Sequence, residues 1–324
     1  MDIKESILKV LENNRGKSIS GTKLANELSV TRSAIWKNIK QLQEEGYKIT
    51  AVNNRGYCLL PENDIISPQS IKPYLKGQAR DFIFDIRQSV TSTNTLAKEM
   101  ASKGAKEGTV IIAREQTEGR GRMGRSFYSP ANTGIYFSII LRPKLTIEDS
   151  LLITTSAAVA VADAIEEVSG SKTQIKWVND IYVSDKKVCG ILTEASLNFE
   201  NGGLEYAVVG IGININTDIF PDDIKTIAGS VFESKPKDIP ITSILLANII
   251  NNIASSMGSL TDKRYLDEYK RRSFLIGKPI VVFKGKDKLT AKAIDIDDKA
   301  RLLVEYDDGS LEALQSGEVS VRAV

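Results

Sequence analysis

The first sixty residues alternate apolar and polar positions with the period of short helices. Apolar side chains recur every three or four residues over residues 3–13, 21–30 and 32–46, which predicts three amphipathic helices. Ser20 and Thr31 stand where the N-caps of the second and third helices are expected, and Gly46 stands where the third ends. Two β-rich runs around a polar turn then predict a hairpin.

Three short helices followed by a hairpin are typical of a winged helix-turn-helix. The residues that we expect to contact DNA are the polar and basic positions of the third helix and the wing tip, namely Thr31, Arg32, Ser33, Lys37, Asn38, Lys40 and Arg55. A small helical domain used for protein contacts is the alternative, but turn, recognition helix and wing together favour DNA. Because the charge excess is modest, we expect useful affinity only from a dimer.

The middle of the chain mixes strand and helix patterns. Strands are predicted at residues 81–90, 108–115, 134–143 and 205–216, with a hairpin at 174–196. Helices are predicted after residue 94 and at residues 150–168, 241–256 and 262–275. Together these patterns predict an α+β multidomain protein with a central mixed sheet covered by helices.

Short β runs return from about residue 277 onward. They cover residues 279–282, 289–296, 301–306 and 311–315, which predicts a small C-terminal barrel of SH3-like size. Residues 61–70 are polar and contain two prolines, so they are interpreted as a linker. The expected domains are therefore residues 1–63, 64–275 and 276–324.

Composition narrows the possible chemistry. Of 324 residues, 42% are hydrophobic and 26% charged, which is the profile of a globular protein with more than one domain. No apolar run is long enough to span a bilayer and no signal peptide is recognisable, so we expect a cytoplasmic protein without membrane contacts. The chain contains no histidine, which excludes Ser-His-Asp and Cys-His catalysis. Cys58 and Cys189 lack metal-ligand spacing and are expected to be reduced.

Charge is unevenly distributed along the chain. Residues 1–60 hold ten basic and six acidic residues, whereas the whole chain carries a net charge of only +2. The N-terminal part is therefore mildly basic, and the remainder is not a general polyanion binder.

Residues 116–130, QTEGRGRMGRSFYSP, carry the most distinctive chemistry. Their glycines match GxGxxG, but the following residues cannot open a helix and no Gly-Lys-Ser/Thr follows, which excludes a dinucleotide fingerprint and a P-loop. What remains is a glycine-rich loop with Arg120, Arg122 and Arg125, whose forked donors suit carboxylate and phosphate. A plain basic surface loop is the alternative, but the interleaved glycines favour anion binding.

This loop strongly resembles the biotin-binding loop of biotin–protein ligases. Further blocks resemble that family in the family's order, namely TSTN at 91–94, KWVND at 176–180, KKVCGIL at 186–192, GIGININ at 210–216 and SGEVSVR at 316–322. The N-terminal winged helix matches the bifunctional ligase–repressor subgroup, so the resemblance covers essentially the whole chain. It implies a central domain of the class II synthetase-like type.

The resemblance implies a reaction in two steps. The biotin carboxylate attacks the α-phosphate of ATP to give biotinyl-5′-AMP and pyrophosphate, and a lysine of a biotin carboxyl carrier domain then takes the biotinyl group. ATP and Mg²⁺ would be needed, without a tightly bound prosthetic group. The adenylate would also act as a corepressor that favours a homodimer on operator DNA.

The resemblance also implies a set of site residues. For biotin the candidates are Ser92, Thr93, Asn94, Gln116, Arg120, Gly121, Arg122, Lys187, Gly210 and Gly212. For the nucleotide they are Arg122, Arg125, Phe127, Asn179, Lys187 and Asn214. We expect Lys187 and Arg122 to be the catalytic residues that screen negative charge, and Asp180 to bind Mg²⁺. An idle turn lysine and a plain Asn-Asp turn are the alternatives for Lys187 and Asp180.

Some residues depart from the family pattern. Val178 stands where proline is common, Phe127 where a tryptophan can sit, and Glu118 adds a negative charge to the loop. Two rival functions stay open. One is a lipoate–protein ligase, against which the arginine loop and KKVCGIL argue. The other is a transcription factor that senses biotin without turnover, against which Lys187 argues.

Overall fold

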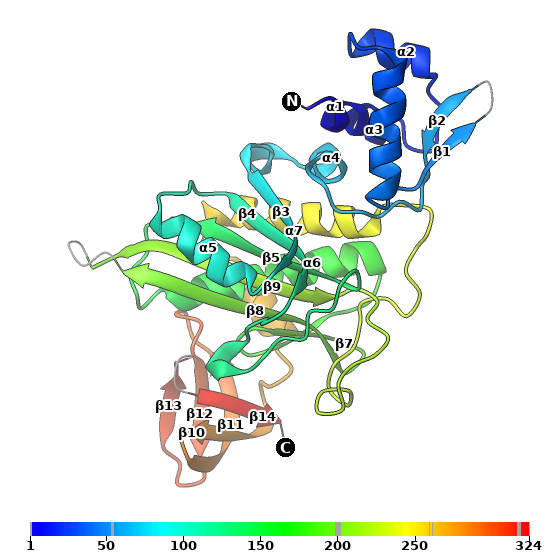
Figure 1. Ribbon diagram of the computed structural model, residues 1–324. Coiled ribbons are helices and arrows are strands. Elements are labelled where there is room, and N and C mark those ends of the chain that lie inside the picture. The colour runs from blue at the N-terminus through cyan, green and yellow to red at the C-terminus, as the bar shows by residue number, and fades with distance from the viewer. Residues whose placement is uncertain are drawn as a thin grey trace. The chain divides into compact units, whose positions relative to one another are not determined.

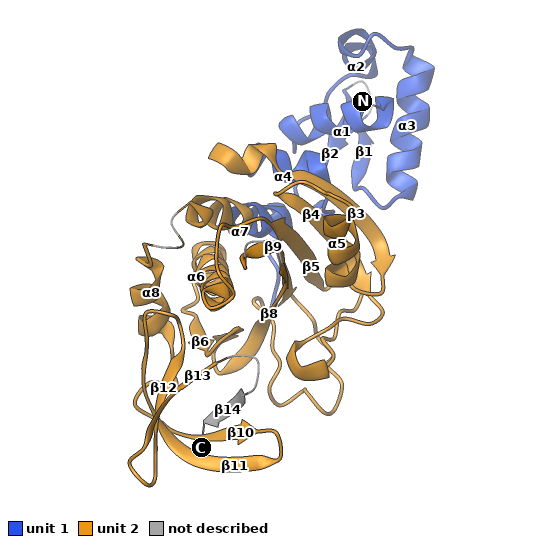
Figure 2. Ribbon diagram, turned by 90° about the vertical axis from the view of Figure 1, so that its left-hand side faces the viewer, with its two compact units in different colours: residues 1–76, 234–248 blue, residues 77–233, 249–324 orange. Residues whose placement is uncertain are grey.

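The computed structural model describes residues 2–52, 55–197, 202–258, 260, 262–315 and 319–323. The chain divides into two compact units, residues 1–76 with 234–248 (unit 1) and residues 77–233 with 249–324 (unit 2) (Figure 2). This division differs from the three expected domains, whose boundaries stay a prediction. Within the described residues, no helix is long and apolar enough to cross a membrane.

Unit 1 begins with the three predicted helices, α1 (Ile3–Asn13), α2 (Gly21–Glu27) and α3 (Arg32–Glu44). Both predicted N-caps are confirmed, because Ser20 Oγ accepts from the backbone N of Lys23 at 3.1 Å and Thr31 Oγ1 accepts from that of Ala34 at 3.2 Å. The apolar faces of the helices meet in one core, which includes Ile7, Leu11, Leu24, Ile35, Ile39 and Leu42.

The predicted wing is present as β1 (Ile49–Val52) and β2 (Gly56–Leu59), which pair antiparallel with Ile49 opposite Leu59. Residues 53 and 54 of its turn lie outside the described residues. The three helices and this hairpin confirm the helix-turn-helix with a wing (Figure 1).

The interpretation of residues 61–70 as a linker is wrong for its second half. Pro68–Ile71 form α4, and Ser67 and Ser70 exchange side-chain-to-backbone hydrogen bonds in a capping box. Asn63 is also buried, and its Oδ1 accepts from the backbone N of Lys48 at 2.9 Å. A packed segment whose polar residues hydrogen-bond one another has the same composition as an exposed linker. The sequence therefore did not distinguish a packed segment from a linker.

Unit 2 is built on a seven-stranded sheet, which confirms the predicted central mixed sheet. Its strands are β3 (Ile83–Val90), β4 (Thr109–Gln116), β5 (Gly134–Leu141), β6 (Gln174–Lys176), β7 (Asp180–Val183), β8 (Lys186–Leu197) and β9 (Leu204–Asn214). Their order is β3-β4-β5-β9-β8-β7-β6, and all neighbours are antiparallel except β3 and β4.

Helices α5 (Thr93–Ser102) and α6 (Ser150–Ser169) cover opposite faces of this sheet (Figures 1 and 2). Ala97 and Ala101 of α5 pack on Ile111, Ile140 and Val208. Because both faces are covered, β5 and β9 are buried along almost their whole length and show no alternation.

The single hairpin predicted over residues 174–196 is three strands in the structure. A tight turn after Lys176 separates β6 from β7, and the peptide bond between Trp177 and Val178 in it is cis. Trp177 Nε1 donates to Ala300 O at 3.0 Å, and the Tyr269 hydroxyl of α8 (Tyr265–Arg272) donates to Val178 O at 2.9 Å. The turn is therefore held from two sides.

The C-terminal part of unit 2 is a small antiparallel sheet. Its strands are β10 (Pro279–Lys284), β11 (Asp287–Ile296), β12 (Leu302–Tyr306), β13 (Leu311–Leu314) and β14 (Val319–Ala323), in the order β13-β12-β11-β10-β14. The first four were predicted. The fifth falls in the SGEVSVR block, of which residues 316–318 lie outside the described residues.

The N-cap of α2 gives a local test of the fold. We expect Ser20→Ala to lower the local stability of α2 by about 1 kcal/mol, because the backbone N of Lys23 loses its acceptor. Hydrogen exchange of the amides in residues 20–28 measures this loss. Thr22→Ala removes an exposed hydroxyl on the same helix and should not lower the protection, because alanine has a higher helix propensity than threonine. Equal protection in Ser20→Ala and Thr22→Ala would contradict the cap.

Candidate functional site

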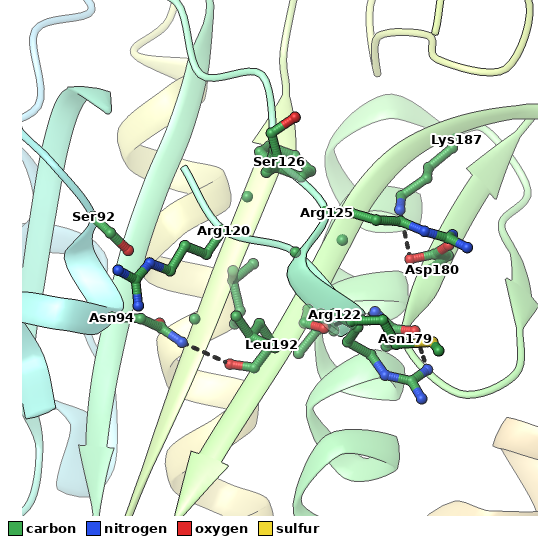
Figure 3. A pocket seen from close by; sticks show the side chains of 18 of the residues that line it. Ser92, Asn94, Arg120, Arg122, Arg125, Ser126, Asn179, Asp180, Lys187 and Leu192 are labelled. Carbon is green, nitrogen blue, oxygen red and sulfur yellow. Dashed lines mark hydrogen bonds and ion pairs between the residues drawn. The ribbon is translucent and has the colours of Figure 1, made fainter. Parts of the chain in front are cut away.

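Unit 2 contains a pocket where the start of α5, the loop after β4 and strands β7, β8 and β9 meet (Figure 3). Its lining residues are Ser92, Thr93, Asn94, Gln116, Arg120, Gly121, Arg122, Met123, Arg125, Ser126, Phe127, Lys176, Trp177, Asn179, Asp180, Lys187, Gly190, Ile191, Leu192, Gly210, Ile211 and Gly212. All residues expected to bind biotin or a nucleotide are among them, except Asn214. Segments far apart in sequence are thus brought to one place.

Asn94, at the start of α5, is fixed by three hydrogen bonds. Its Nδ2 donates to Leu192 O at 3.1 Å and to Glu194 Oε2 at 2.9 Å, and Ser138 Oγ donates to its Oδ1 at 2.6 Å. Gly210 admits this side chain, since a Cβ there would collide with Asn94 Oδ1. Donors and an acceptor on opposite ends of the amide determine which way it faces.

Gln116, at the end of β4, links α5 to the far end of the arginine loop. Its Oε1 accepts from the backbone N of Thr93 at 2.9 Å and from Thr93 Oγ1 at 3.1 Å, and its Nε2 donates to Ser129 Oγ at 2.9 Å. Both ends of the amide are therefore engaged within the protein. Ser92, Thr93 and Asn94 are all buried, so this wall of the pocket is polar but enclosed.

The arginine loop, residues 119–127, folds back on itself. The backbone N of Gly121 donates to Arg125 O at 2.7 Å, and that of Phe127 donates to Gly119 O at 2.8 Å. The turn Arg122–Gly124 (η3) forms its tip. Arg120 and Arg125 are exposed, and their side chains lie on different sides of the pocket in Figure 3.

Arg122 is the half-buried arginine of the loop. Its Nη1 donates to Asn179 Oδ1 at 3.1 Å, and Asn179 Nδ2 donates to Ile191 O at 2.8 Å. Burial lowers the pKa of Arg122, and the negative charge of Asp180 partly offsets this effect. The loop is thereby attached through Asn179 to the turn between β6 and β7.

Lys187 lies in β8 and in the pocket lining rather than in the turn before the strand. Its Nζ lies 2.7 Å from Asp180 Oδ1, and a bulge in the pairing of β7 with β8 lies beside it. The described lining contains five cationic side chains, Arg120, Arg122, Arg125, Lys176 and Lys187, but one carboxylate, Asp180. This excess of positive charge suits a ligand that carries several negative charges.

The described residues hold no cluster of three side chains that would ligate a metal. Asp180 alone offers a carboxylate to the pocket, and Lys187 already pairs with it. One carboxylate fits Mg²⁺ that shares its other ligands with substrate phosphates, because Mg²⁺ is commonly bound in this way.

Phe127 covers the bare backbone of two strands. A Cβ at Gly212 or Gly190 would meet its ring, which also packs edge-on against Tyr136 with ring centroids 6.4 Å apart. Burial raises the pKa of Tyr136 to about 12, so its hydroxyl keeps the proton that it donates to Pro130 O. Stacking of Phe127 on adenine stays a prediction.

Three expectations about this site need correction. Gly210 and Gly212 were expected to bind biotin, but Asn94 and Phe127 occupy the spaces over them. Asn214 was expected beside the nucleotide, but it is buried outside the pocket lining and its Nδ2 donates to Gly229 O at 3.0 Å. A polar residue at the end of an apolar strand looks the same in the sequence whether it binds a nucleotide or bonds another part of the protein.

The residues expected to contact DNA fall into two groups. Arg32, Ser33, Lys37, Lys40 and Arg55 are exposed. Thr31 Oγ1 caps α3, and Asn38 is half-buried with its Nδ2 donating to Ala34 O at 2.9 Å. The side chains of Thr31 and Asn38 are therefore engaged with their own helix.

The sequence analysis missed the residues that support Asn94. Ser138 is fully buried and bonds both Asn94 and Thr93, while Glu194 bonds Asn94 and pairs with Lys98. A signal was present, since Ser138 interrupts the apolar run of residues 134–141. A buried hydroxyl in such a run needs a partner.

Comparison with known proteins agrees with this geometry. Residues 86–214 match the Biotin/lipoate A/B protein ligase family, residues 4–58 match an HTH domain, and residues 275–322 match the Biotin protein ligase C terminal domain. The Bifunctional ligase/repressor BirA of Bacillus spizizenii is 33% identical over 98% of this chain and 98% of its own length. The chain belongs to the bifunctional ligase/repressor family.

Other members of this family and its solved structures are more distant. The Bifunctional ligase/repressor BirA of Escherichia coli is 26% identical, covering 95% of this chain and 94% of its own. The biotin protein ligase of Aquifex aeolicus in complex with biotin and ATP is 29% identical, with a TM-score of 0.61 over 75% of this chain and 99% of that chain. The matches to known proteins thus cover both the central sheet and the helix-turn-helix of this chain.

The contact between Gly210 and Asn94 makes a testable prediction. We expect Gly210→Ala to destabilise unit 2 by about 1–3 kcal/mol, because the new methyl group would overlap Asn94 Oδ1 and displace the amide. Urea unfolding followed by tryptophan emission measures the change, because the buried Trp177 of unit 2 becomes exposed on unfolding. Gly258→Ala is the matched control, since open space surrounds its Cβ position. A Gly210→Ala protein as stable as the control would show that Asn94 is not held against β9.

Proposed function

We propose that the chain joins biotin to ATP as biotinyl-5′-AMP and then transfers the biotinyl group to a lysine of a biotin carboxyl carrier domain. The observation that carries this proposal is the pocket that combines Lys187, Arg122 and the loop arginines with the enclosed wall of Ser92, Thr93 and Asn94. A cationic side suits phosphate and carboxylate, and a polar wall suits an uncharged ring with its own donors and acceptors.

In the first step, the biotin carboxylate attacks the α-phosphate and pyrophosphate leaves. Both reactants are anions, so they repel each other until nearby cations screen them. Lys187 and Arg122 supply this screening, and Lys187 stabilises the charge that develops on the transferring phosphate. Asp180 and Asn179 keep the two cations in place before the substrates bind.

In the second step, a neutral lysine amine of the acceptor attacks the acyl carbon, an amide bond forms and AMP leaves with the bonding electrons. The amine loses a proton to solvent. Lys187 then stabilises the negative charge on the acyl oxygen. Asp180 is the residue that would hold Mg²⁺, which would supply positive charge to the ATP phosphates.

The site residues divide between the two substrates. We assign biotin to Ser92, Thr93, Asn94, Gln116, Arg120 and Gly121, and the nucleotide to Arg125, Phe127 and Asn179. Since Asn94 and Gln116 are already bonded within the protein, we infer that they shape the ring site by holding their neighbours.

We further propose that the adenylate acts as corepressor. Binding of the adenylate would order the tip of the arginine loop and favour a homodimer, which binds two half-sites of an operator through the helix-turn-helix. We propose a cytoplasmic location, which ATP-dependent synthesis together with gene regulation would support. We also propose the domain boundaries 1–63, 64–275 and 276–324, a central domain related to class II synthetases and an SH3-like closure of the C-terminal sheet.

Biotin-dependent exchange of pyrophosphate into ATP tests the enzyme. We expect exchange with biotin and none with lipoate, and a fall of about 10²–10³-fold in Lys187→Ala, because a cation at the reacting phosphate is lost. Lys186→Ala is the matched control, since Lys186 is the neighbour in β8 and its Nζ donates to Thr226 O outside the pocket lining. It should retain full exchange.

Each alternative function gives a different outcome. Exchange with lipoate would favour a lipoate ligase. Binding of biotin without any exchange would leave a sensor that regulates transcription. Full exchange in Lys187→Ala would refute the role of Lys187 but would leave the proposed ligase activity standing.

Operator binding tests the regulatory part. We expect the affinity of the full chain for duplexes selected from a random library to rise about tenfold when biotin and ATP are added, because a ligand shifts an equilibrium by its differential affinity for two states. Electrophoretic mobility shift at fixed salt measures the affinity, and sedimentation measures the self-association. Equal affinity with and without the ligands would contradict the corepressor role.

A further inference from the structure

One tryptophan of α3 is left open to solvent. Trp36 is 57% exposed, whereas Ile35, Ile39 and Leu42 of the same helix are at most 1% exposed. The chain has two tryptophans, and the other, Trp177, is 3% exposed. A large aromatic ring on an otherwise polar helix face contributes nothing to the core of unit 1, so it is available for a partner.

The surroundings of Trp36 indicate the charge of that partner. Four-residue spacing places Arg32, Trp36 and Lys40 in one row on the helix surface, with Ser33 and Lys37 in the adjacent row. Arg32, Lys37 and Lys40 are exposed, and no acidic residue occurs between positions 28 and 43. The ring therefore lies within a basic surface that a polyanion complements.

A second copy of this chain fits this surface poorly. In a two-fold contact the same patch meets itself, which would bring the basic residues of one copy against those of the other. A DNA duplex supplies phosphates for the basic residues on both sides of the ring. We therefore commit to duplex DNA as the occupant.

The chemistry of the major groove then decides what the ring contacts. The base edges there are donors and acceptors, and the apolar group among them is the C5 methyl of thymine. Contact between the indole ring and a polar base edge removes water from that edge and stabilises the complex little. Contact between the ring and the thymine methyl group buries apolar surface on the ring and on the methyl group.

We propose that Trp36 determines operator specificity by packing its ring against thymine methyl groups in the major groove, while Arg32, Lys37 and Lys40 supply the charge-dependent affinity. This inference rests on the proposed repressor function. It adds a residue that reads sequence through shape and apolar contact rather than through hydrogen bonds.

Replacement of thymine by uracil tests the contact, because uracil lacks the methyl group and keeps the same donors and acceptors. Duplexes are first selected from a random library with the full chain in the presence of biotin and ATP. Each thymine of the selected half-site is then replaced by uracil in turn. We expect wild-type protein to lose about fourfold in affinity at one or two positions, the value of one buried methyl group.

Variants assign this loss to Trp36. Trp36→Ala should bind the thymine duplex more weakly and no longer distinguish thymine from uracil at those positions. Trp36→Phe retains an aromatic ring and should restore part of the discrimination. Lys37→Ala is the matched control from the adjacent row, and it should weaken thymine and uracil duplexes alike, since a phosphate contact carries no base information.

The failures can be told apart. Wild-type protein that selects no duplex would overturn the repressor function and this inference together. Wild-type protein that selects duplexes but treats thymine and uracil alike at every position would overturn the role of Trp36 alone. Full discrimination in Trp36→Ala would do the same, because another group would then contact the methyl.

Discussion

The bare backbone of β9 at Gly210 and Gly212 determines where the pocket lies. In a sheet covered on both faces, side chains normally fill the space above every strand. At these two positions that space is taken by Asn94 from α5 and Phe127 from the arginine loop, which reach the backbone itself. α5 and the arginine loop therefore both contact the central strand β9, and the pocket is the space between these two segments. A side chain at Gly210 would displace Asn94 of α5, and one at Gly212 would displace Phe127 of the loop.

The second constraint is electrostatic. Five cations and one carboxylate line a partly enclosed pocket, and like charges repel more strongly there than in water. The protein limits this cost by pairing Lys187 with Asp180 and by bonding Arg122 to Asn179. Arg120 and Arg125 remain in solvent, where screening is effective. Lys187 and Arg122 are thus held in place without a ligand, and an anionic ligand would relieve the repulsion that remains.

The sequence predicted the elements better than it predicted what individual polar residues do. The strands with continuous apolar runs, the helices with capped starts and the wing were all recognisable, because burial and capping leave local patterns. The predicted mixed sheet and helix-turn-helix are confirmed, and the family resemblance agrees with 33% identity over nearly the full chain. The extra turn at Trp177 was missed because its partner Ala300 lies far away in sequence. The helix at Pro68–Ile71 was missed because its capping serines have the composition of an exposed linker.

All the residues expected to bind biotin or the nucleotide except Asn214 lie in one pocket, but their partners were not visible in the sequence. Blocks such as TSTN and GIGIN indicate that residues belong together, and the pocket unites them. Whether an amide faces a ligand or the protein depends on neighbours such as Ser138 and Glu194, which no block contains. Asn214 lies in the GIGININ block and yet points to Gly229. Motifs therefore locate a site, and packing assigns the roles within it.

The arginine loop combines a fixed base with an open tip, and this combination is what a ligand-dependent switch requires. The base is held by Gln116 with Ser129 and by the Tyr136 hydroxyl at Pro130, while Met123 and Arg125 at the tip are exposed. A bound anion can order the tip without disturbing the base. A ligand changes a distant affinity only if it binds two states of the protein unequally. Arg122 in the tip is already bonded to Asn179, so the exposed Arg125 is the loop residue that we propose to respond to the adenylate.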